Sequence, residues 1–186
     1  MIGKKNVVFG FLFLVITAAL GPLMIIKYTP EVAVAQSQKQ TSVGRLQSLK
    51  ADDFEEELEQ LTPEQIAKAN TDGILALNQL INAQQPIDVI RSGPHVHGNL
   101  EALLNIVAGI ALGFMAISRL FKQIISWIFI VGTLMHSGLL YVGVMLDMGW
   151  AFTLLGTGIG PGMVLLGLLL AGIGAAVGLK AEVVRD

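Results

Sequence analysis

Apolar residues gather in four long stretches of this chain, and polar segments separate them. The stretches cover residues 6–26, 99–117, 124–146 and 151–179. Each has about the 20 residues that a helix needs to cross a hydrocarbon core of about 30 Å. The pattern predicts an all-α fold: an integral membrane four-helix bundle with a short helical extramembrane segment between its first and second helices.

The predicted boundaries follow from the breaks between these stretches. The last stretch is interrupted by a glycine-rich run, 156–162, which contains Pro161. Either one long helix is broken there, or the spanning part begins near Pro161 after an interfacial loop. We prefer the second option, because proline suits the first turn of a helix and about 19 residues follow it. We expect an N-terminal signal anchor and first membrane helix at 1–26, an extracytoplasmic segment at 27–96, and a three-helix membrane domain at 97–186 with spans at about 97–117, 124–146 and about 161–179.

The first apolar stretch has two interpretations. Lys4 and Lys5 precede it, as in a secretory signal, and Ala33-Val34-Ala35 resembles a small-residue cleavage site. The stretch is longer than the roughly 7–15 apolar residues of a signal peptide, so we favour an uncleaved anchor. Gly21-Pro22 should bend its outer end.

The segment 27–96 differs in composition from the rest of the chain. It holds ten of the fourteen acidic residues and six of the twelve basic ones, which gives a local charge of −4. We expect one short amphipathic helix to open at Asp52. A second should begin at Thr62, with a capping box to Gln65, and end at Pro86. The Gln- and Ser-rich stretch 36–48 predicts a mobile link. Two such short helices should lie against the bundle or a partner.

The short loops predict the orientation of the chain. If four segments cross, one side of the membrane receives all the basic residues that flank them, and the positive-inside rule makes that side cytoplasmic. Both termini should then be cytoplasmic and residues 27–96 periplasmic or extracellular, in a bacterial inner (plasma) membrane. The basic residues concerned are Lys4, Lys5, Arg119, Lys122, Lys180 and Arg185.

Composition narrows the possible functions. The net charge of −2 provides no basic face for nucleic acid, so we expect no nucleic-acid partner. The lack of cysteine excludes thiolate metal sites and cysteine nucleophiles. No Ser-His-Asp, zincin or paired-carboxylate pattern is present, so we predict no catalytic residues and favour a protein that is not an enzyme.

Three polar residues at the head of the second apolar stretch predict a buried site. His97, Glu101 and Asn105 are four residues apart, which places them on one face of a helix. A carboxylate within a membrane needs a partner, a proton or a cation, and His97 and Asn105 flank Glu101 by one turn each. The alternative is that the helix begins deeper and Glu101 is solvated among the headgroups.

His95 extends this set to a candidate metal site of His95, His97 and Glu101. In an extended segment the two histidines point the same way and could share one Zn²⁺ or Cu²⁺. In a helix they diverge by about 200°, and only His97 aligns with Glu101. The alternative is a pair of histidines at the wet membrane interface.

His136 lies near the middle of the third apolar stretch, with Thr133 and Ser137 on the same broad face. We expect it at the depth of Asn105 and well below His97, so a haem between His97 and His136 would require helix tilt or kinking. The candidate cofactor ligands are His97, His136 and Asn105, for haem b or for a copper or zinc ion. The alternative is that His136 only hydrogen-bonds across the bundle to Asn105 or a hydroxyl.

These features lead to one preferred function and two alternatives. The preferred one is an accessory subunit that binds haem b or a metal ion within a larger membrane complex, with other membrane subunits or further copies of itself as partners. The first alternative is a structural or assembly subunit without a cofactor. The second is a component of proton- or ion-coupled transport, with Glu101 and the histidines as a relay.

Overall fold

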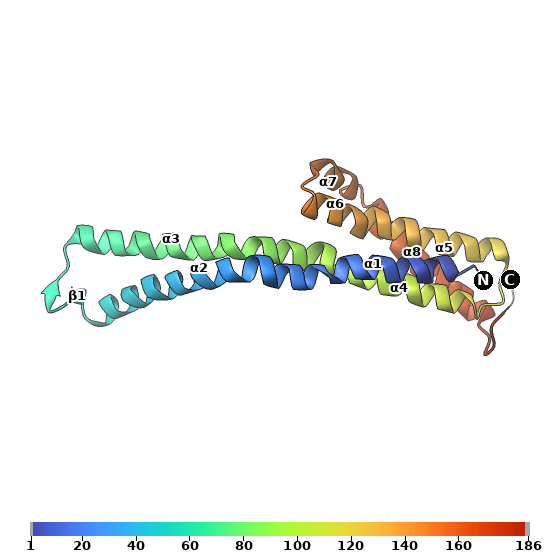
Figure 1. The fold of residues 1–186 in the computed structure, drawn as a ribbon, viewed down its shortest axis with the longest axis horizontal. Coiled ribbons are helices and arrows are strands. Elements are labelled where there is room, and N and C mark those ends of the chain that lie inside the picture. Colours follow the sequence, from blue (N-terminus) through green and yellow to red (C-terminus); the bar gives the residue numbers. More distant parts are fainter. Residues whose placement is uncertain (1, 185–186) are drawn as a thin grey trace. The chain divides into compact units, whose positions relative to one another are not determined.

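The computed structural model describes residues 2–184 and divides the chain into two compact units. The first unit comprises Met1–Pro22 and Val89–Asp186, and the second comprises Leu23–Asp88. Both are helical apart from one hairpin of two-residue strands (Figure 1), so the predicted all-α class is confirmed. The helices are α1 (Lys4–Ala18), α2 (Leu20–Ala51), α3 (Pro63–Ile90), α4 (Val96–Leu112), α5 (Arg119–Thr133), α6 (Leu139–Met145), α7 (Gly149–Leu155) and α8 (Ile159–Gly178).

Three helical stretches of the described chain are long and apolar enough to cross a membrane. They are Lys4–Ala51, which joins α1 and α2, Arg119–Met145, which joins α5 and α6, and Ile159–Gly178. The fourth predicted span corresponds to α4, whose 17 residues extend about 26 Å, slightly less than the hydrocarbon core. A four-span bundle therefore stays a prediction, while three candidate spans are observed.

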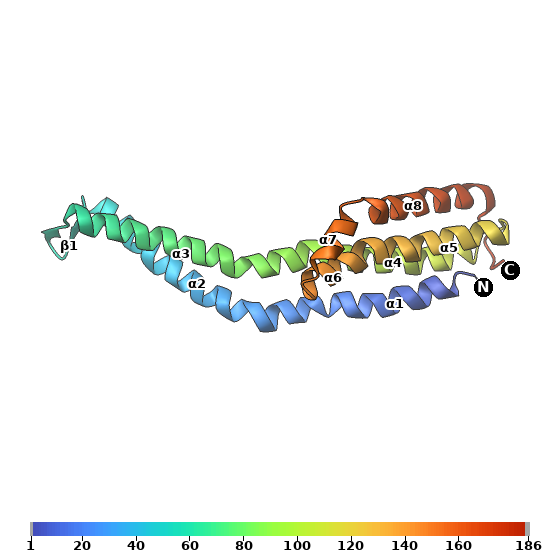
Figure 2. The ribbon, with the colours of Figure 1, turned by 90° about the horizontal axis from the view of Figure 1, so that it is seen from above.

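In the first unit α1 packs along α4 and α5 packs along α8, while α4 and α5 join the two pairs (Figure 2). Glycines bring α1 and α4 close together: a Cβ on Gly10 would lie 2.6 Å from the Ala102 carbonyl oxygen. Such small residues allow close helix contact where lipid supplies no hydrophobic driving force. The apolar core between α4, α5 and α8 contains the buried residues Ala108, Leu112, Met115, Ile125 and Phe129.

The chain segments at one end of the first unit bond to one another. Lys180 N–H donates to the Phe114 carbonyl at 2.8 Å, and the Lys5 ammonium donates to Gln123 Oε1 at 2.5 Å. The beginnings of α1 and α5 and the end of α8, which have basic residues in or beside them, thus lie at the same end of the unit as the end of α4. The predicted orientation requires these basic residues to lie on one side of a membrane. Arg185 lies outside the described residues.

The beginnings of α5 and α8 can be compared with the predicted boundaries. The expected loop at 118–123 is wrong beyond Ser118, because α5 already begins at Arg119. The Ser118 hydroxyl caps it by accepting the Phe121 N–H at 3.2 Å. By contrast, α8 begins at Ile159, two residues before the preferred start at Pro161 and directly after Gly158 in the left-handed conformation (φ 71°). Residues before this break form α7 in place of the expected interfacial loop.

The first helix is interrupted at Ala19, between α1 and α2. Pro22 has no N–H to donate to the carbonyl of Ala18, so the helical ladder loses one bond at this point. The helix is therefore interrupted about one turn before Gly21-Pro22, where the bend was predicted.

The second unit contains most of α2 and α3, whose contact is apolar and small. Ala35 of α2 packs with Leu80 and Ala83 of α3. The predicted mobile link at 36–48 is wrong, because these residues belong to α2. Pro86 does not end the following helix either, since α3 continues to Ile90.

The turn between α2 and α3 replaces the short helix expected from Asp52. It contains strands β1 (Glu55–Glu56) and β2 (Glu59–Gln60), which pair antiparallel. Four of its residues have positive φ, which a right-handed helix excludes: Asp53, Phe54, Glu57 and Leu58. Two hydrogen bonds from the Arg45 guanidinium hold the pKa of the Glu56 carboxyl below its usual value.

The start of α3 agrees with its predicted capping box. Thr62 N–H donates to Gln65 Oε1 at 2.8 Å, and Gln65 N–H donates to Thr62 Oγ1 at 3.3 Å. These reciprocal bonds satisfy donors that the first turn of a helix leaves unpaired. The local sequence therefore determines this boundary.

Replacing Gly160 with alanine should destabilise the first unit. Its Cβ would lie 2.5 Å from the Met135 carbonyl carbon and oxygen, so α8 must shift away from the α5–α6 helix. We expect the free energy of unfolding to fall by about 1–3 kcal/mol. Gly162→Ala is the matched control, because a Cβ there meets nothing within 4 Å. Unfolding in a denaturing detergent, followed by circular dichroism, measures both; equal stability of the two variants contradicts this packing.

Candidate functional site

Three polar side chains of the first unit meet between α4 and the junction of α5 with α6. His97 and Glu101 are one turn apart on α4, and His136 lies in the π-helical segment Leu134–Gly138 between α5 and α6. One potential ligand atom from each lies within 4.8 Å of the others. The site therefore contains His97 and Glu101, two of the three residues predicted to share one helix face, together with His136, which lies 35 residues after Glu101.

The Glu101 carboxylate is the centre of this site. Its side chain is 5% exposed, and both oxygens accept a hydrogen bond. His136 Nδ1 lies 2.5 Å from Oε1, and the Ser137 hydroxyl donates to Oε2 at 2.6 Å. Ionised carboxylates accept hydrogen bonds only, so this arrangement fits a charged Glu101 with the proton on His136 Nδ1. Burial of the charge is compensated by its two donors.

The π-helical segment explains why two consecutive residues reach one carboxylate. Successive side chains of an α-helix diverge by about 100°, which normally prevents neighbours from sharing a target. A π-helical turn inserts an additional residue and reorients the side chains around it, and such turns occur frequently at functional sites. Here it directs both His136 and Ser137 toward α4.

His97 completes the group from the side of α4. The centroids of the His97 and His136 rings are 4.9 Å apart, and the ring planes are tilted by 59°. The prediction that His97 lies well above His136 is therefore wrong. It assumed that a helix begins near His97, whereas α3 leads into α4 through the π-helical segment Arg91–His95, kinked at Gly93. A Cβ on Gly93 would lie 3.9 Å from Leu140, which places residues after His136 beside residues before His97.

A second polar layer lies one turn further along α4. Asn105 is fully buried, and its amide donates to Thr133 Oγ1 at 2.9 Å and to the Glu101 carbonyl at 3.0 Å. Asn6 of α1 donates to Asn105 Oδ1 at 3.1 Å and accepts the Ser126 hydroxyl. Asn105 therefore meets Thr133 rather than His136, and it links three helices instead of facing the carboxylate.

His95 does not join the site. Its Nδ1 lies 2.9 Å from the Thr17 carbonyl oxygen and 3.4 Å from the Asn99 amide. The two histidines diverge because both lie in helical backbone, which is the outcome that the helical interpretation of the His95-Val96-His97 motif gives. The structure therefore does not bring together the predicted metal set of His95, His97 and Glu101; the group that could hold a metal ion is His97, Glu101 and His136.

A cavity of about 240 Å³ adjoins the site between α4 and α8. Glu101 and His136 supply the polar part of its lining, and the remaining six residues are apolar. Because Nδ1 of His136 is bonded to Glu101, Nε2 is the ring nitrogen left for a ligand. The apolar lining consists of Leu100, Leu104, Pro161, Val164, Leu165 and Leu168.

Three residues of these polar layers are not among the predicted site residues. Ser137 follows His136 directly, and Asn6 and Ser126 lie in the first and third apolar stretches. Their signal was present, since a polar residue within a membrane helix usually faces another helix. Within residues 2–184 no buried side-chain nitrogen or oxygen lacks a hydrogen-bond partner.

Replacing Asn105 with leucine should destabilise the first unit, because Thr133 and Asn6 each lose a partner. Hydrogen bonds between membrane helices contribute about 0.6–1.7 kcal/mol each, so we expect a loss of about 1–3 kcal/mol in the free energy of unfolding. Val107→Ala, at a 61% exposed position of the same helix, is the control. Detergent unfolding measures both variants, and an Asn105→Leu protein as stable as the control contradicts a structural role for this layer.

Comparison of the chain with known protein families, with curated proteins and with solved structures finds no match. No relative therefore suggests a role for any of these residues. The geometry of His97, Glu101 and His136, with the adjoining cavity, is the basis for assigning a function.

Proposed function

We propose that this protein binds one divalent transition-metal ion, such as Zn²⁺ or Cu²⁺, through His97, Glu101 and His136. The observation that supports the proposal is the convergence of two imidazoles and a buried carboxylate within 4.8 Å. Two histidines and one glutamate, with a further position left open, form a ligand set known for zinc. The charge of Glu101, costly to bury alone, would be neutralised by the ion.

Small side-chain movements would complete such a site. Metal bonds of about 2.0–2.1 Å place tetrahedral ligands roughly 3.3 Å apart, so ligand atoms that lie within 4.8 Å of one another must approach by at most about 1.5 Å. The hydrogen bond between Glu101 and His136 would be replaced by bonds to the shared ion. Ser137 would then orient the carboxylate by retaining its bond to Oε2, as partners of metal ligands commonly do.

The ring geometry favours a bare ion over haem b between the two histidines. A porphyrin must lie between its two axial imidazoles. The His97 and His136 rings instead contact each other, with 4.9 Å between their centroids. Asn105, the third predicted cofactor ligand, is occupied by bonds to Thr133 and Asn6, so we assign it a supporting role.

We also propose that the protein is a subunit of a larger assembly in a bacterial inner membrane, with both termini cytoplasmic. The meeting of the basic segments at one end of the first unit supports this orientation. An exposed apolar row on α3 supports a protein partner for the second unit, since such a row otherwise faces water. Its members are Ile74, Leu75, Leu77 and Ile81.

Metal analysis of the purified protein tests the ligand set. We expect about one ion per chain, and His97→Ala, Glu101→Gln and His136→Ala should each weaken binding by at least about 100-fold, because each removes one of three ligands. Ser137→Ala should weaken it about 10- to 100-fold, as expected for a residue that orients a ligand. Zn²⁺ or Co²⁺ titration in detergent, with the ligand-field spectrum of Co²⁺ as readout, measures these affinities.

His95→Ala is the control for these variants. His95 is two residues from His97 but bonds to Thr17, so its replacement should leave metal affinity unchanged. Metal binding that depends on His95 and not on His136 would contradict the assignment. Binding that survives all three ligand variants would exclude the site.

The adjoining cavity supports a second candidate function, in which the pair of Glu101 and His136 handles a small lipophilic molecule. About 240 Å³ corresponds to roughly eight waters of liquid volume, so the molecule must be small. Its apolar body would contact the leucines of α4 and α8, and one polar group would bond to His136 Nε2. A histidine held by a carboxylate is also a common proton donor and acceptor.

Binding of 2-naphthol and of naphthalene distinguishes this second function. In the native protein 2-naphthol should bind more tightly by about fivefold, because its hydroxyl gains a hydrogen bond of about 1 kcal/mol. The difference should disappear in His136→Ala and persist in His95→Ala. Saturation-transfer NMR in matched detergent measures both ligands, and equal binding of the two by the native protein excludes the function.

A further inference from the structure

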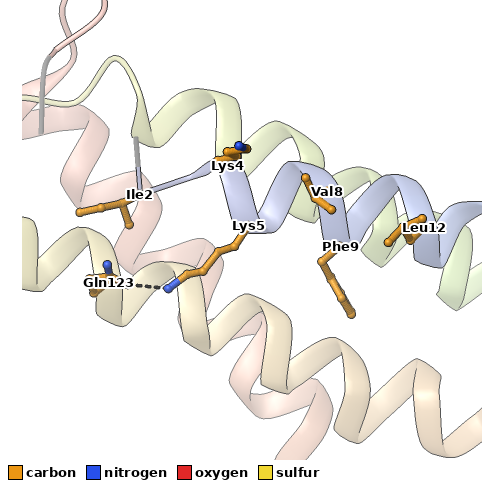
Figure 3. Close-up of a pocket in the computed structure, with 7 residues that line it drawn as sticks. All are labelled: Ile2, Lys4, Lys5, Val8, Phe9, Leu12 and Gln123. Carbon is orange, nitrogen blue, oxygen red and sulfur yellow. Dashed lines mark hydrogen bonds between the residues drawn. The ribbon is translucent and has the colours of Figure 1, made fainter.

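A groove between the beginnings of α1 and α5 combines two lysines with an apolar floor. Its volume is about 770 Å³, and Figure 3 shows its lining: Ile2, Lys4, Lys5, Val8, Phe9, Leu12 and Gln123. On α1 these residues form two rows at helical spacing. Lys4 is followed by Val8 and Leu12, and Lys5 is followed by Phe9. Each row thus begins with a positive charge and continues along an apolar surface.

The lining of the groove carries positive charge and no negative charge. None of its seven lining residues is a carboxylate, and Lys4 is exposed. The Lys5 ammonium uses one hydrogen bond on Gln123 and lies 4.2 Å from the centroid of the Trp127 ring. An ammonium has three donors, so Lys5 keeps capacity for an anion. Arg119, exposed one turn before Gln123 on α5, adds a further positive charge nearby.

We propose that this groove binds one anionic phospholipid. Its phosphate would contact Lys4 and Lys5, and an acyl chain would follow Val8, Phe9 and Leu12. The exposed fractions of Val8 (48%) and Leu12 (64%) leave room for such a chain on the surface of a helix apolar enough to cross a membrane. Trp127 is 54% exposed and lies beside Lys5, and tryptophans are enriched where membrane helices meet the headgroups.

The positive charges of Lys4 and Lys5 should favour anionic phospholipids over zwitterionic ones. Basic residues beside a membrane surface attract anionic headgroups by about 1 kcal/mol each, whereas a zwitterionic headgroup carries no net charge to attract. The end of the first unit that carries basic residues is also the end that the positive-inside rule assigns to the cytoplasm, where anionic lipids face such residues. A lipid held only by apolar contact would show no such preference.

This lipid site is separate from the candidate metal site. A Cβ on Gly109 of α4 would lie 2.6 Å from the Gly3 carbonyl oxygen, so the beginning of α1 packs at Gly109. Gly109 is 12 residues from His97, which corresponds to about 18 Å along the helix. Either site can therefore be absent without affecting the evidence for the other.

Trp127 provides a direct readout of lipid in the groove. The chain has two tryptophans, and Trp150 belongs to α7, so a Trp150→Phe protein reports Trp127 alone. This protein is reconstituted in vesicles that contain a small fraction of brominated phosphatidylglycerol or brominated phosphatidylcholine, since bromine quenches nearby tryptophans. We expect half-maximal quenching at an about 25-fold lower fraction of the anionic lipid, or about fivefold for each lysine.

Variants of Lys4 and Lys5 test whether the preference for the anionic lipid arises in the groove. Lys4→Gln with Lys5→Gln should abolish it, whereas Lys4→Arg with Lys5→Arg should retain it because the charges remain. Lys27→Gln is the matched control, since Lys27 is an exposed lysine of α2 near the ring of Tyr28. Equal quenching by the two lipids in the Trp150→Phe protein, or an unchanged preference in the double glutamine variant, overturns the proposal.

Discussion

Burial of the Glu101 carboxylate sets the arrangement of the helices around it. An ionised carboxylate within an apolar bundle is stable only with donors or a cation beside it, and here both oxygens are bonded, to His136 and to Ser137. These bonds fix the rotation of α4 relative to the junction of α5 and α6. The same rotation brings His97 against His136 and turns Asn105 toward Thr133. The candidate metal centre and the polar layer beside it are thus consequences of one constraint.

Close backbone packing makes this constraint geometrically possible. Gly160 of α8 lies directly against the backbone of Met135 and His136, and Gly10 of α1 lies against Ala102, the residue after Glu101. Larger residues at either glycine would push a neighbouring helix away from the segment that carries the site. The small residues of α1 and α8 therefore allow the helices to associate closely and also keep the polar side chains in position.

The two proposed ligands of the first unit would use different physical interactions. The metal ion would be held by a fixed set of side chains with little exposure, where a change of one residue removes a bond. The phospholipid would be held at an open surface by charge and apolar contact, where each lysine contributes a similar small increment. A protein with both properties would present its metal centre at a defined depth and orientation in an assembly.

The sequence by itself determined the helical class, three helices long and apolar enough to cross a membrane, the Thr62 capping box and the start of α8 near Pro161. It also placed His97, Glu101 and Asn105 on one helix face. These features depend on periodicity and on neighbours within one or two turns, which the order of residues specifies directly. It did not determine that His136 pairs with Glu101, that Asn6 and Ser126 join Asn105, or that residues 36–48 continue α2. Those outcomes depend on which helices pack together and at what depth, and only the tertiary structure decides that. The helix that contains His97 does not begin near that residue, because α3 continues through a kink at Gly93 into α4. Depths counted from the expected beginning of this helix were therefore wrong.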